Sequence, residues 1–166
     1  AQQVSDRFTA TVKSQLRTDV PLGAFLSAGI DSTAIVATVA KLTGQPLSTY
    51  TIAFPPEDSH SGLMLDDPAV ARRTADTLGC RHTEILVRPD VASLLPKLIW
   101  HLDEPIADPA VIMAFLVNRE ASRELKVMLS GIGGDEIFAG YRKHQAHYLA
   151  EKYCRIPEFI RRYAIE

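Results

Sequence analysis

The chain has 166 residues, of which 46% are apolar and 23% charged, and its formal net charge is −2. This length and composition are typical of one globular domain with its own core, so we expect a single domain over residues 1–166. The slight negative charge gives no field that would attract nucleic acid or an anionic membrane, and no apolar run approaches the roughly 18 residues of a membrane span. Cys80 and Cys154 show no zinc or redox spacing, which favours a reducing, cytoplasmic location.

Short apolar runs alternate with longer amphipathic stretches, a pattern typical of βαβ units. In chain order, the pattern predicts a helix over residues 5–18, a strand over 22–26, a helix over 32–42, a strand over 47–54, a loop over 55–67, a helix over 68–78, a strand over 82–87, helices over 91–102 and 109–123, a strand over 126–129, a helix from 134 to about 155 with a break near Gly140, and a helical tail over 157–166. Crossovers between parallel strands are right-handed, so helices should cover both faces of the sheet. We therefore predict a three-layer α/β/α fold with a mainly parallel sheet.

The loop at residues 27–32 reads Ser-Ala-Gly-Ile-Asp-Ser and joins the first predicted strand to a helix. Its small residues let the backbone approach a ligand, and the helix directs free N–H groups and its positive dipole end at the loop. A phosphate or pyrophosphate fits there, and Asp31, which would repel a bare phosphate, indicates a bridging Mg²⁺. A plain strand-to-helix turn capped by serine or aspartate is the alternative.

A second loop, Ser-Gly-Ile-Gly-Gly-Asp-Glu at residues 130–136, follows the fourth predicted strand. Ligands of parallel sheets bind beyond the carboxyl ends of the strands, which is where both loops begin. Asp135 is then a second carboxylate for the same Mg²⁺. Capping of the next helix by Asp135 is the alternative.

The loop at 27–32 resembles the Ser-Gly-Gly-x-Asp-Ser pyrophosphate loop of the N-type ATP pyrophosphatases, with Ala28 in place of the first glycine. Three further segments narrow the resemblance to the asparagine synthetase class, namely residues 20–23, 103–109 and 133–141. This resemblance covers roughly Arg17 to Tyr141. It implies an adenine nucleotide alpha hydrolase-like fold, with ATP and Mg²⁺ as cofactors.

By position, the resemblance also implies roles for individual residues. Leu26 and Ile52 should line the adenine and ribose pocket, largely through backbone groups. The residues expected to contact the pyrophosphate and the rest of the nucleotide are Ser27, Ala28, Gly29, Ile30, Asp31, Ser32, Ser130 and Gly131. The residues expected to ligate Mg²⁺ are Asp31 and Asp135. Candidates for the substrate pocket are Asp103, Glu104, Gly133, Gly134 and Glu136, although Asp103 and Glu104 could equally form a polar turn.

The sequence departs from the family pattern at Ile132, where many members carry an acidic residue and related β-lactam-forming synthetases a tyrosine. Isoleucine can neither move a proton nor carry charge, so no catalytic residue is assigned. Family enzymes also have an N-terminal glutaminase domain and a C-terminal remainder with a charge-stabilising lysine, neither of which is recognisable here. We expect the chain to be a piece of a larger protein and a poor enzyme by itself.

The implied reaction is ATP-dependent activation of a carboxylate, aspartate in the parent family, as an acyl-AMP, followed by amidation with ammonia from glutamine to give asparagine. Two alternatives stay open. One is an amidotransferase-like synthetase for a β-lactam, peptide or sugar-linked carboxylate, and the other is a nucleotide-binding domain without turnover. The expected partners are the small carboxylate, ammonia or glutamine and the glutaminase domain, without nucleic acid or membrane; a homodimer is an open possibility.

Overall fold

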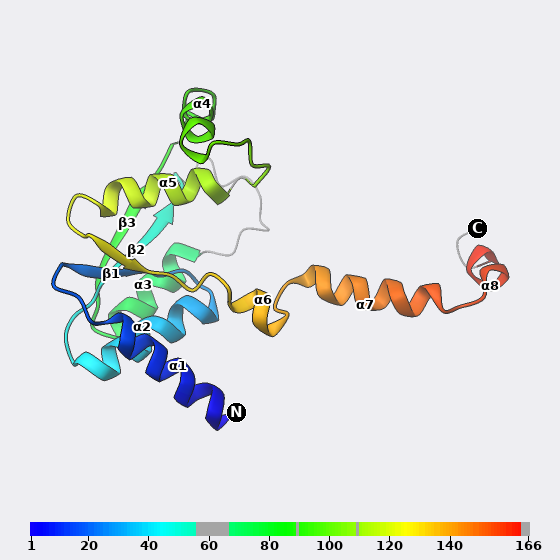
Figure 1. The fold of residues 1–166 in the computed structure, drawn as a ribbon, viewed down its shortest axis with the longest axis horizontal. Coiled ribbons are helices and arrows are strands. Elements are labelled where there is room, and N and C mark those ends of the chain that lie inside the picture. Colours follow the sequence, from blue (N-terminus) through cyan, green and yellow to red (C-terminus); the bar gives the residue numbers. More distant parts are fainter. Residues whose placement is uncertain (56–66, 89, 109, 164–166) are drawn as a thin grey trace. The chain divides into compact units, whose positions relative to one another are not determined.

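The fold is described by a computed structural model over residues 1–55, 67–88, 90–108 and 110–163 (Figure 1). The chain divides into two compact units, residues 1–131 and 132–166. The single domain expected from length stays a prediction. The predicted loop at 55–67 falls almost wholly outside the described residues.

The first unit is built on a parallel sheet of four strands in the order β3-β2-β1-β4. The strands are β1 (Leu22–Phe25), β2 (Ser48–Ala53), β3 (Arg81–Leu86) and β4 (Val127–Leu129). Ala24 in the central strand β1 is opposite Thr49 of β2 on one side and Leu129 of β4 on the other. All four predicted strands are therefore confirmed, with ends shifted by one residue or so, as expected of boundary assignments.

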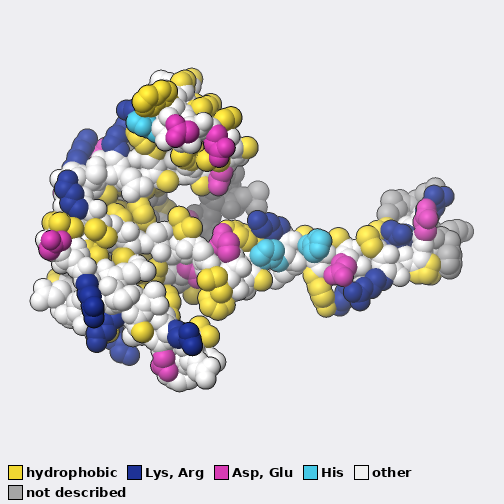
Figure 2. Space-filling view, viewed as in Figure 1, with side chains coloured by type: hydrophobic (Ala, Val, Ile, Leu, Met, Phe, Trp, Pro, Cys, Tyr) yellow, Lys and Arg dark blue, Asp and Glu magenta, His cyan; other side chains and the backbone are white. Residues whose placement is uncertain are grey.

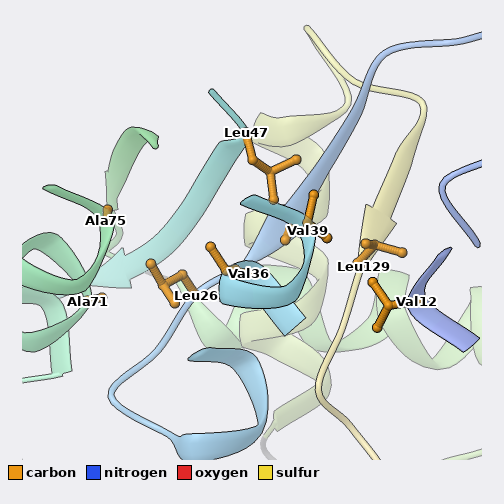
Figure 3. Close-up of a cluster of buried hydrophobic side chains, with 9 residues drawn as sticks. Val12, Leu26, Val36, Val39, Leu47, Ala71, Ala75 and Leu129 are labelled. Carbon is orange, nitrogen blue, oxygen red and sulfur yellow. The ribbon is translucent and has the colours of Figure 1, made fainter. Parts of the chain in front are cut away.

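Helices cover both faces of this sheet, which confirms the predicted three layers (Figure 1). On one face, α1 (Gln2–Gln15), α2 (Ile30–Thr43) and α3 (Asp67–Thr77) enclose a core around Leu26, Val36 and Leu47 (Figure 3). On the other face, α4 (Val91–Leu102) and α5 (Ala110–Ala121) enclose a second core that includes Tyr50, Ile85 and Leu116. Two separate apolar cores hold the sheet rigid between them, so the loops at its carboxyl end start from fixed positions.

The end of α1 and the start of α2 differ from the sequence prediction, each for a local reason. The first helix ends at Gln15 rather than near Thr18, because the Thr18 hydroxyl accepts a hydrogen bond from Val20 N–H (3.2 Å) and forms a turn there. The second helix begins at Ile30 rather than Ser32, because Gly29 is the extended N-cap (φ −72°, ψ 147°). The earlier start brings Asp31 into the first helical turn.

The second unit contains three helices, α6 (Gly134–Phe138), α7 (Arg142–Cys154) and α8 (Glu158–Tyr163). The break predicted near Gly140 lies between α6 and α7. Apolar, basic and histidine side chains are spread along α7 (Figure 2), whose sequence holds one acidic residue, Glu151. Exposed ion pairs such as Arg155–Glu151 (3.1 Å) add little stability. Among all described helices, none is both long and apolar enough to cross a membrane.

His82, at the start of β3, lies in a setting that favours the neutral form of its side chain. Its Nδ1 lies 3.0 Å from the hydroxyl of the buried Thr49, and its Nε2 is buried with no hydrogen-bond partner in the described structure. Burial lowers the pKa of His82, an effect that the charge of Arg72 reinforces and those of Glu84 and Asp76 oppose. Protonation would place a charge where no acceptor compensates it.

We expect the free energy of unfolding to fall as the pH drops from about 7.5 to about 5.5. A histidine with a lowered folded-state pKa binds fewer protons folded than unfolded. Its contribution is therefore complete above the unfolded pKa of about 6.5 and is lost as the pH falls toward the folded-state pKa. Urea titrations at both pH values should show a smaller decrease for His82→Gln than for the unmodified protein.

His147→Gln, on the exposed α7, is the matched control and should keep the full pH dependence. The salt bridge of Glu84 with Arg72 (2.7 Å) lowers the pKa of Glu84, so its contribution to stability is present throughout this pH range and is lost only at lower pH. An unchanged pH dependence in His82→Gln would contradict the assignment to His82.

Candidate functional site

The candidate site lies where the chain leaves β1 and β4. These strands are parallel neighbours, but the chain continues from β1 through α2 to β2 on the opposite side of β1 from β4. This is the point at which the strand order reverses, and ligands of open α/β sheets bind at such points beyond the carboxyl ends. The two loops predicted to carry chemistry therefore emerge side by side from the sheet.

The first loop is held by the hydroxyl of Ser32, which is buried beneath it. Ser27 N–H donates to Ser32 Oγ (3.1 Å), the two serine hydroxyls are 3.0 Å apart, and Ser32 Oγ donates to the carbonyl of Gly29 (3.1 Å). Since one hydroxyl has one donor and two acceptor positions, these contacts use its full capacity. The Ser32 hydroxyl therefore shapes the loop, and the predicted contact of Ser32 with pyrophosphate stays a prediction.

Helix α2 presents free backbone donors to this loop. Gly29 has no side chain with which to cap the helix, and the first intrahelical bond runs from Thr33 N–H to the Gly29 carbonyl (3.2 Å). The N–H groups of Ile30, Asp31 and Ser32 precede that bond and have no acceptor within the described part of the chain. Unpaired N–H groups at the positive end of a helix form a site for an anion.

Ala28 does not strain the loop, although it replaces a glycine of the family pattern. It is absent from the described residues with positive φ, which apart from glycines are Asp103 and Ala139. An alanine in an ordinary backbone conformation carries no steric penalty. The substitution is therefore compatible with the loop shape.

The second loop meets the first through Gly131. A Cβ atom added to Gly131 would lie 2.8 Å from the backbone nitrogen of Ser32 and 3.0 Å from the carbonyl carbon of Asp31. Real Cβ atoms essentially never approach as closely as 2.8 Å and rarely as closely as 3.0 Å, and the neighbouring atoms are backbone that cannot yield easily. Only glycine allows this approach, so the structure brings residues 27–32 and Gly131 together as the sequence predicted.

The two carboxylates of the second loop, Asp135 and Glu136, belong to the second unit. Gly133 (φ 103°) leads into α6, where the Asp135 carbonyl accepts from Gly140 N–H (3.1 Å) and a Cβ on Gly140 would meet the Asp135 carboxylate. The Tyr141 hydroxyl donates to Glu136 and lowers the pKa of that carboxyl. Because Asp31 and Asp135 lie in different units, a metal shared between them stays a prediction.

Leu26 and Ile52 do not share a pocket through their side chains. Leu26 belongs to the core under α2, whereas Ile52 packs against the core on the α5 face. The backbone of Leu26 is also engaged, since its N–H donates to Tyr50 (2.9 Å) and its carbonyl accepts from the Thr51 hydroxyl. Any nucleotide contact at these positions must come from backbone groups with spare capacity, as the sequence analysis expected.

Thr51 is a contributor that the sequence analysis missed. Its buried hydroxyl donates to the Leu26 carbonyl, directly before the phosphate-type loop. The available signal was a threonine at an inward position of an otherwise buried strand, where an unpaired hydroxyl would be costly. Thr51 thus ties the start of the first loop to the neighbouring strand.

Of the residues predicted for the substrate pocket, Asp103, Glu104 and Glu136 are exposed, whereas Gly133 and Gly134 are half-buried. Asp103 has φ 62° and ends α4, and Glu104 follows it in the turn. Ile132 is 89% exposed. Among the described residues, no three His, Cys, Asp or Glu side chains form a metal-binding group.

Together, the fold and the loop geometry define an α/β protein that presents free helix N–H groups at the switch point of its sheet. The sequence model of the asparagine synthase family matches residues 3–165, so the chain belongs to the asparagine synthase family.

Its relatives agree with this placement. A candidate glutamine-hydrolysing asparagine synthetase of Mycobacterium tuberculosis is 41% identical over 92% of this chain, which corresponds to 22% of that protein. The glutamine-hydrolysing asparagine synthetase 1 of Bacillus subtilis is 36% identical over 97% of the chain and 24% of that protein. The chain thus spans about a quarter of the length of these relatives.

One solved structure, an NH₃-dependent NAD synthetase from Campylobacter jejuni, aligns with a TM-score of 0.47 and 15% identity, covering 84% of this chain and 60% of that one. This similarity is too low to assign function.

Removing the Ser32 hydroxyl should loosen the first loop. We expect Ser32→Ala to lower the free energy of unfolding by about 1–3 kcal/mol, because Ser27 N–H would lose its acceptor in a partly buried position. Ser122→Ala, which removes an exposed hydroxyl bonded to the Arg119 carbonyl, should change it by less than about 0.5 kcal/mol. Chemical denaturation measures both values, and equal effects would contradict the role given to Ser32.

Adding one methyl group at Gly131 should separate the two loops. Gly131→Ala should cost about 1–3 kcal/mol of stability, because the methyl overlaps the backbone of Asp31 and Ser32. Chemical denaturation measures this loss. Ala28→Gly, which removes a methyl from the same site, should cost less than about 1 kcal/mol; an unchanged free energy of unfolding in Gly131→Ala would contradict the packing.

Proposed function

We propose that this chain binds ATP with Mg²⁺ at the carboxyl ends of β1 and β4 and, within a longer protein, activates aspartate as an acyl-AMP for amidation to asparagine. The proposal rests chiefly on the contact of Gly131 with Asp31 and Ser32. That contact sets two glycine-containing loops around the free N–H groups of α2. Membership in the asparagine synthase family supports the same chemistry.

The residues present fit a pyrophosphate group. The N–H groups of Ile30, Asp31 and Ser32 can donate to phosphate oxygens, and the Ser27 hydroxyl lies beside them, where it already accepts from Gly29 N–H (3.1 Å). The absence of a Cβ on Gly131 leaves this donor set uncovered by a side chain. Helix N-termini with such donors bind phosphates because the donors and the dipole act together.

Asp31 makes a bound cation necessary if the site is to hold a polyphosphate. Its carboxylate begins the helix that would face a polyphosphate, so without a cation the two negative charges would repel each other. Asp31 and Asp135 would hold Mg²⁺, and the ion would supply charge neutralisation for the leaving pyrophosphate. One or two carboxylates with phosphate oxygens and waters are the usual ligands of this ion.

In the proposed reaction, an oxygen of the aspartate side-chain carboxylate attacks the α-phosphorus of ATP. The bond between that phosphorus and the bridging oxygen breaks, and pyrophosphate leaves. Ammonia then attacks the acyl carbon, the carbon–oxygen bond to AMP breaks, and the nitrogen loses a proton as the amide forms. The chain's own contribution is to orient the triphosphate and to stabilise charge on the departing pyrophosphate.

Ile132 confines the role of the second loop to positioning. Its side chain is exposed and has no titratable group, so it cannot accept the ammonium proton or stabilise charge. Proton transfer must therefore use another group of the longer protein or the substrates themselves. The loop glycines would still place the backbone beside the nucleotide.

Calorimetry should show ATP binding that depends on Mg²⁺. Asp31→Asn and Asp135→Asn should each weaken it at least about tenfold, since each removes a charge-assisted contact. If both carboxylates bind one ion, the double variant should lose less ATP-binding free energy than the two single variants lose together. Asp19→Asn, in the exposed turn before β1, is the control and should bind normally.

The chemistry is tested by exchange of labelled pyrophosphate into ATP, with the protein at its full natural length. L-aspartate should support exchange above the level without an acid. Exchange with another carboxylate but not with aspartate would show that aspartate is not the acceptor. ATP binding without any exchange would show that the protein is a nucleotide-binding domain and not an enzyme. ATP binding that is unchanged without Mg²⁺ and in both aspartate variants would contradict the proposed site.

A further inference from the structure

The two carboxylates of α6 are neighbours in sequence but have different surroundings. The Tyr141 hydroxyl donates a hydrogen bond to Glu136. The Asp135 carboxylate, in contrast, accepts no hydrogen bond from the residues that the structure describes. A carboxylate whose oxygens are uncommitted can ligate a cation without first giving up a donor. Of the two, Asp135 is therefore the carboxylate that is available to a metal ion.

The chain folds back onto Asp135 after α6 ends. Ala139 has a left-handed conformation (φ 56°), and Gly140 N–H then donates to the Asp135 carbonyl (3.1 Å). This bond brings the backbone of Gly140 beside the side chain of the same aspartate. A Cβ atom added to Gly140 would overlap Asp135 Oδ1 and would lie 3.0 Å from Asp135 Cγ. The carboxylate thus occupies the place that a side chain at position 140 would take.

This close approach, and not a positive φ angle, is what requires glycine at position 140. The described glycines with positive φ are Gly44, Gly79 and Gly133, and Gly140 is not among them. An added methyl group would meet the end of a side chain, and a carboxylate can rotate away from it at little cost. The turn would therefore stay folded while the oxygens of Asp135 changed direction.

We propose that Gly140 is a positioning residue for Mg²⁺ binding, because the space beside its Cα sets the direction of the Asp135 carboxylate. The inference rests on the proposed function, in which Asp135 ligates the ion. Mg²⁺ demands near-ideal octahedral geometry, so a carboxylate that is turned away from the ion is a poorer ligand. A ligand that already has its direction also loses less conformational entropy when the ion binds.

Calorimetry of the protein at its full natural length gives the dissociation constant of ATP with and without Mg²⁺. Gly140→Ala should weaken the Mg²⁺-dependent binding about tenfold and leave the metal-free binding and the melting temperature almost unchanged. Gly44→Ala is the matched control, since it adds the same methyl group at φ 61° with no atom within 4 Å. It should lower the melting temperature and keep the Mg²⁺-dependent binding.

A double-variant cycle shows whether Gly140 acts through Asp135. In Asp135→Ala the overlapping carboxylate is gone, and the nearest atom to the added Cβ is then the Cα of residue 135 at 3.4 Å, an ordinary contact. Adding Gly140→Ala to that variant should change the dissociation constant of ATP with Mg²⁺ by less than about twofold. An equal loss in both backgrounds would overturn the proposal, because the methyl group would then act on another part of the protein.

A crystal structure of Gly140→Ala should show the Asp135 carboxylate in a new direction beside an unchanged turn. A carboxylate that keeps its direction would overturn the proposal. A loss of ATP binding in Asp135→Ala that Gly140→Ala does not reproduce would overturn the positioning role alone. Unchanged binding in Asp135→Ala would overturn the metal role that the proposed function gives to Asp135, and the role of Gly140 with it.

Discussion

The backbone contact of Gly131 with Asp31 and Ser32 is the constraint on which the candidate site depends. Two loops separated by about a hundred residues meet there because β1 and β4 are parallel neighbours and start them from the same edge of the sheet. A side chain on residue 131 would fill the space in front of the helix donors. The sheet sets the direction of the loops, and the glycine sets their distance.

The first loop is preorganised by its own side chains rather than left to order around a ligand. Ser32 Oγ binds groups of Ser27 and Gly29, while Thr51 fixes the Leu26 carbonyl from the neighbouring strand. Each bond contributes only about 1 kcal/mol of net stability. Their larger effect is on binding, because a loop that already has its shape loses less conformational entropy when an anion arrives.

The elements of the fold could be predicted because their signals are local. Apolar runs, glycines at helix ends and the proline before β1 identify every strand and the break at Gly140, and the alternation of strands with helices implies a parallel sheet. The ends of α1 and α2 could not be predicted to the residue, because they depend on the Thr18 turn and on the extended conformation of Gly29. The positions of both loops followed from sequence, whereas the inward direction of the Ser32 hydroxyl required coordinates. The role of Asp135 as a metal ligand is still supported by the sequence alone.

The glycines in and after the second loop have different physical roles. Gly133 supplies a positive φ (103°) at the start of α6, whereas Gly131 and Gly140 leave space for other atoms. At Gly131 those atoms are the backbone of Asp31 and Ser32, which cannot move aside, so a side chain there acts on the packing of the fold. At Gly140 they belong to the Asp135 carboxylate, which can rotate, so a side chain there acts on the direction of one ligand. The glycine content of this segment thus reflects close contacts and one backbone angle, and it does not by itself indicate a flexible loop.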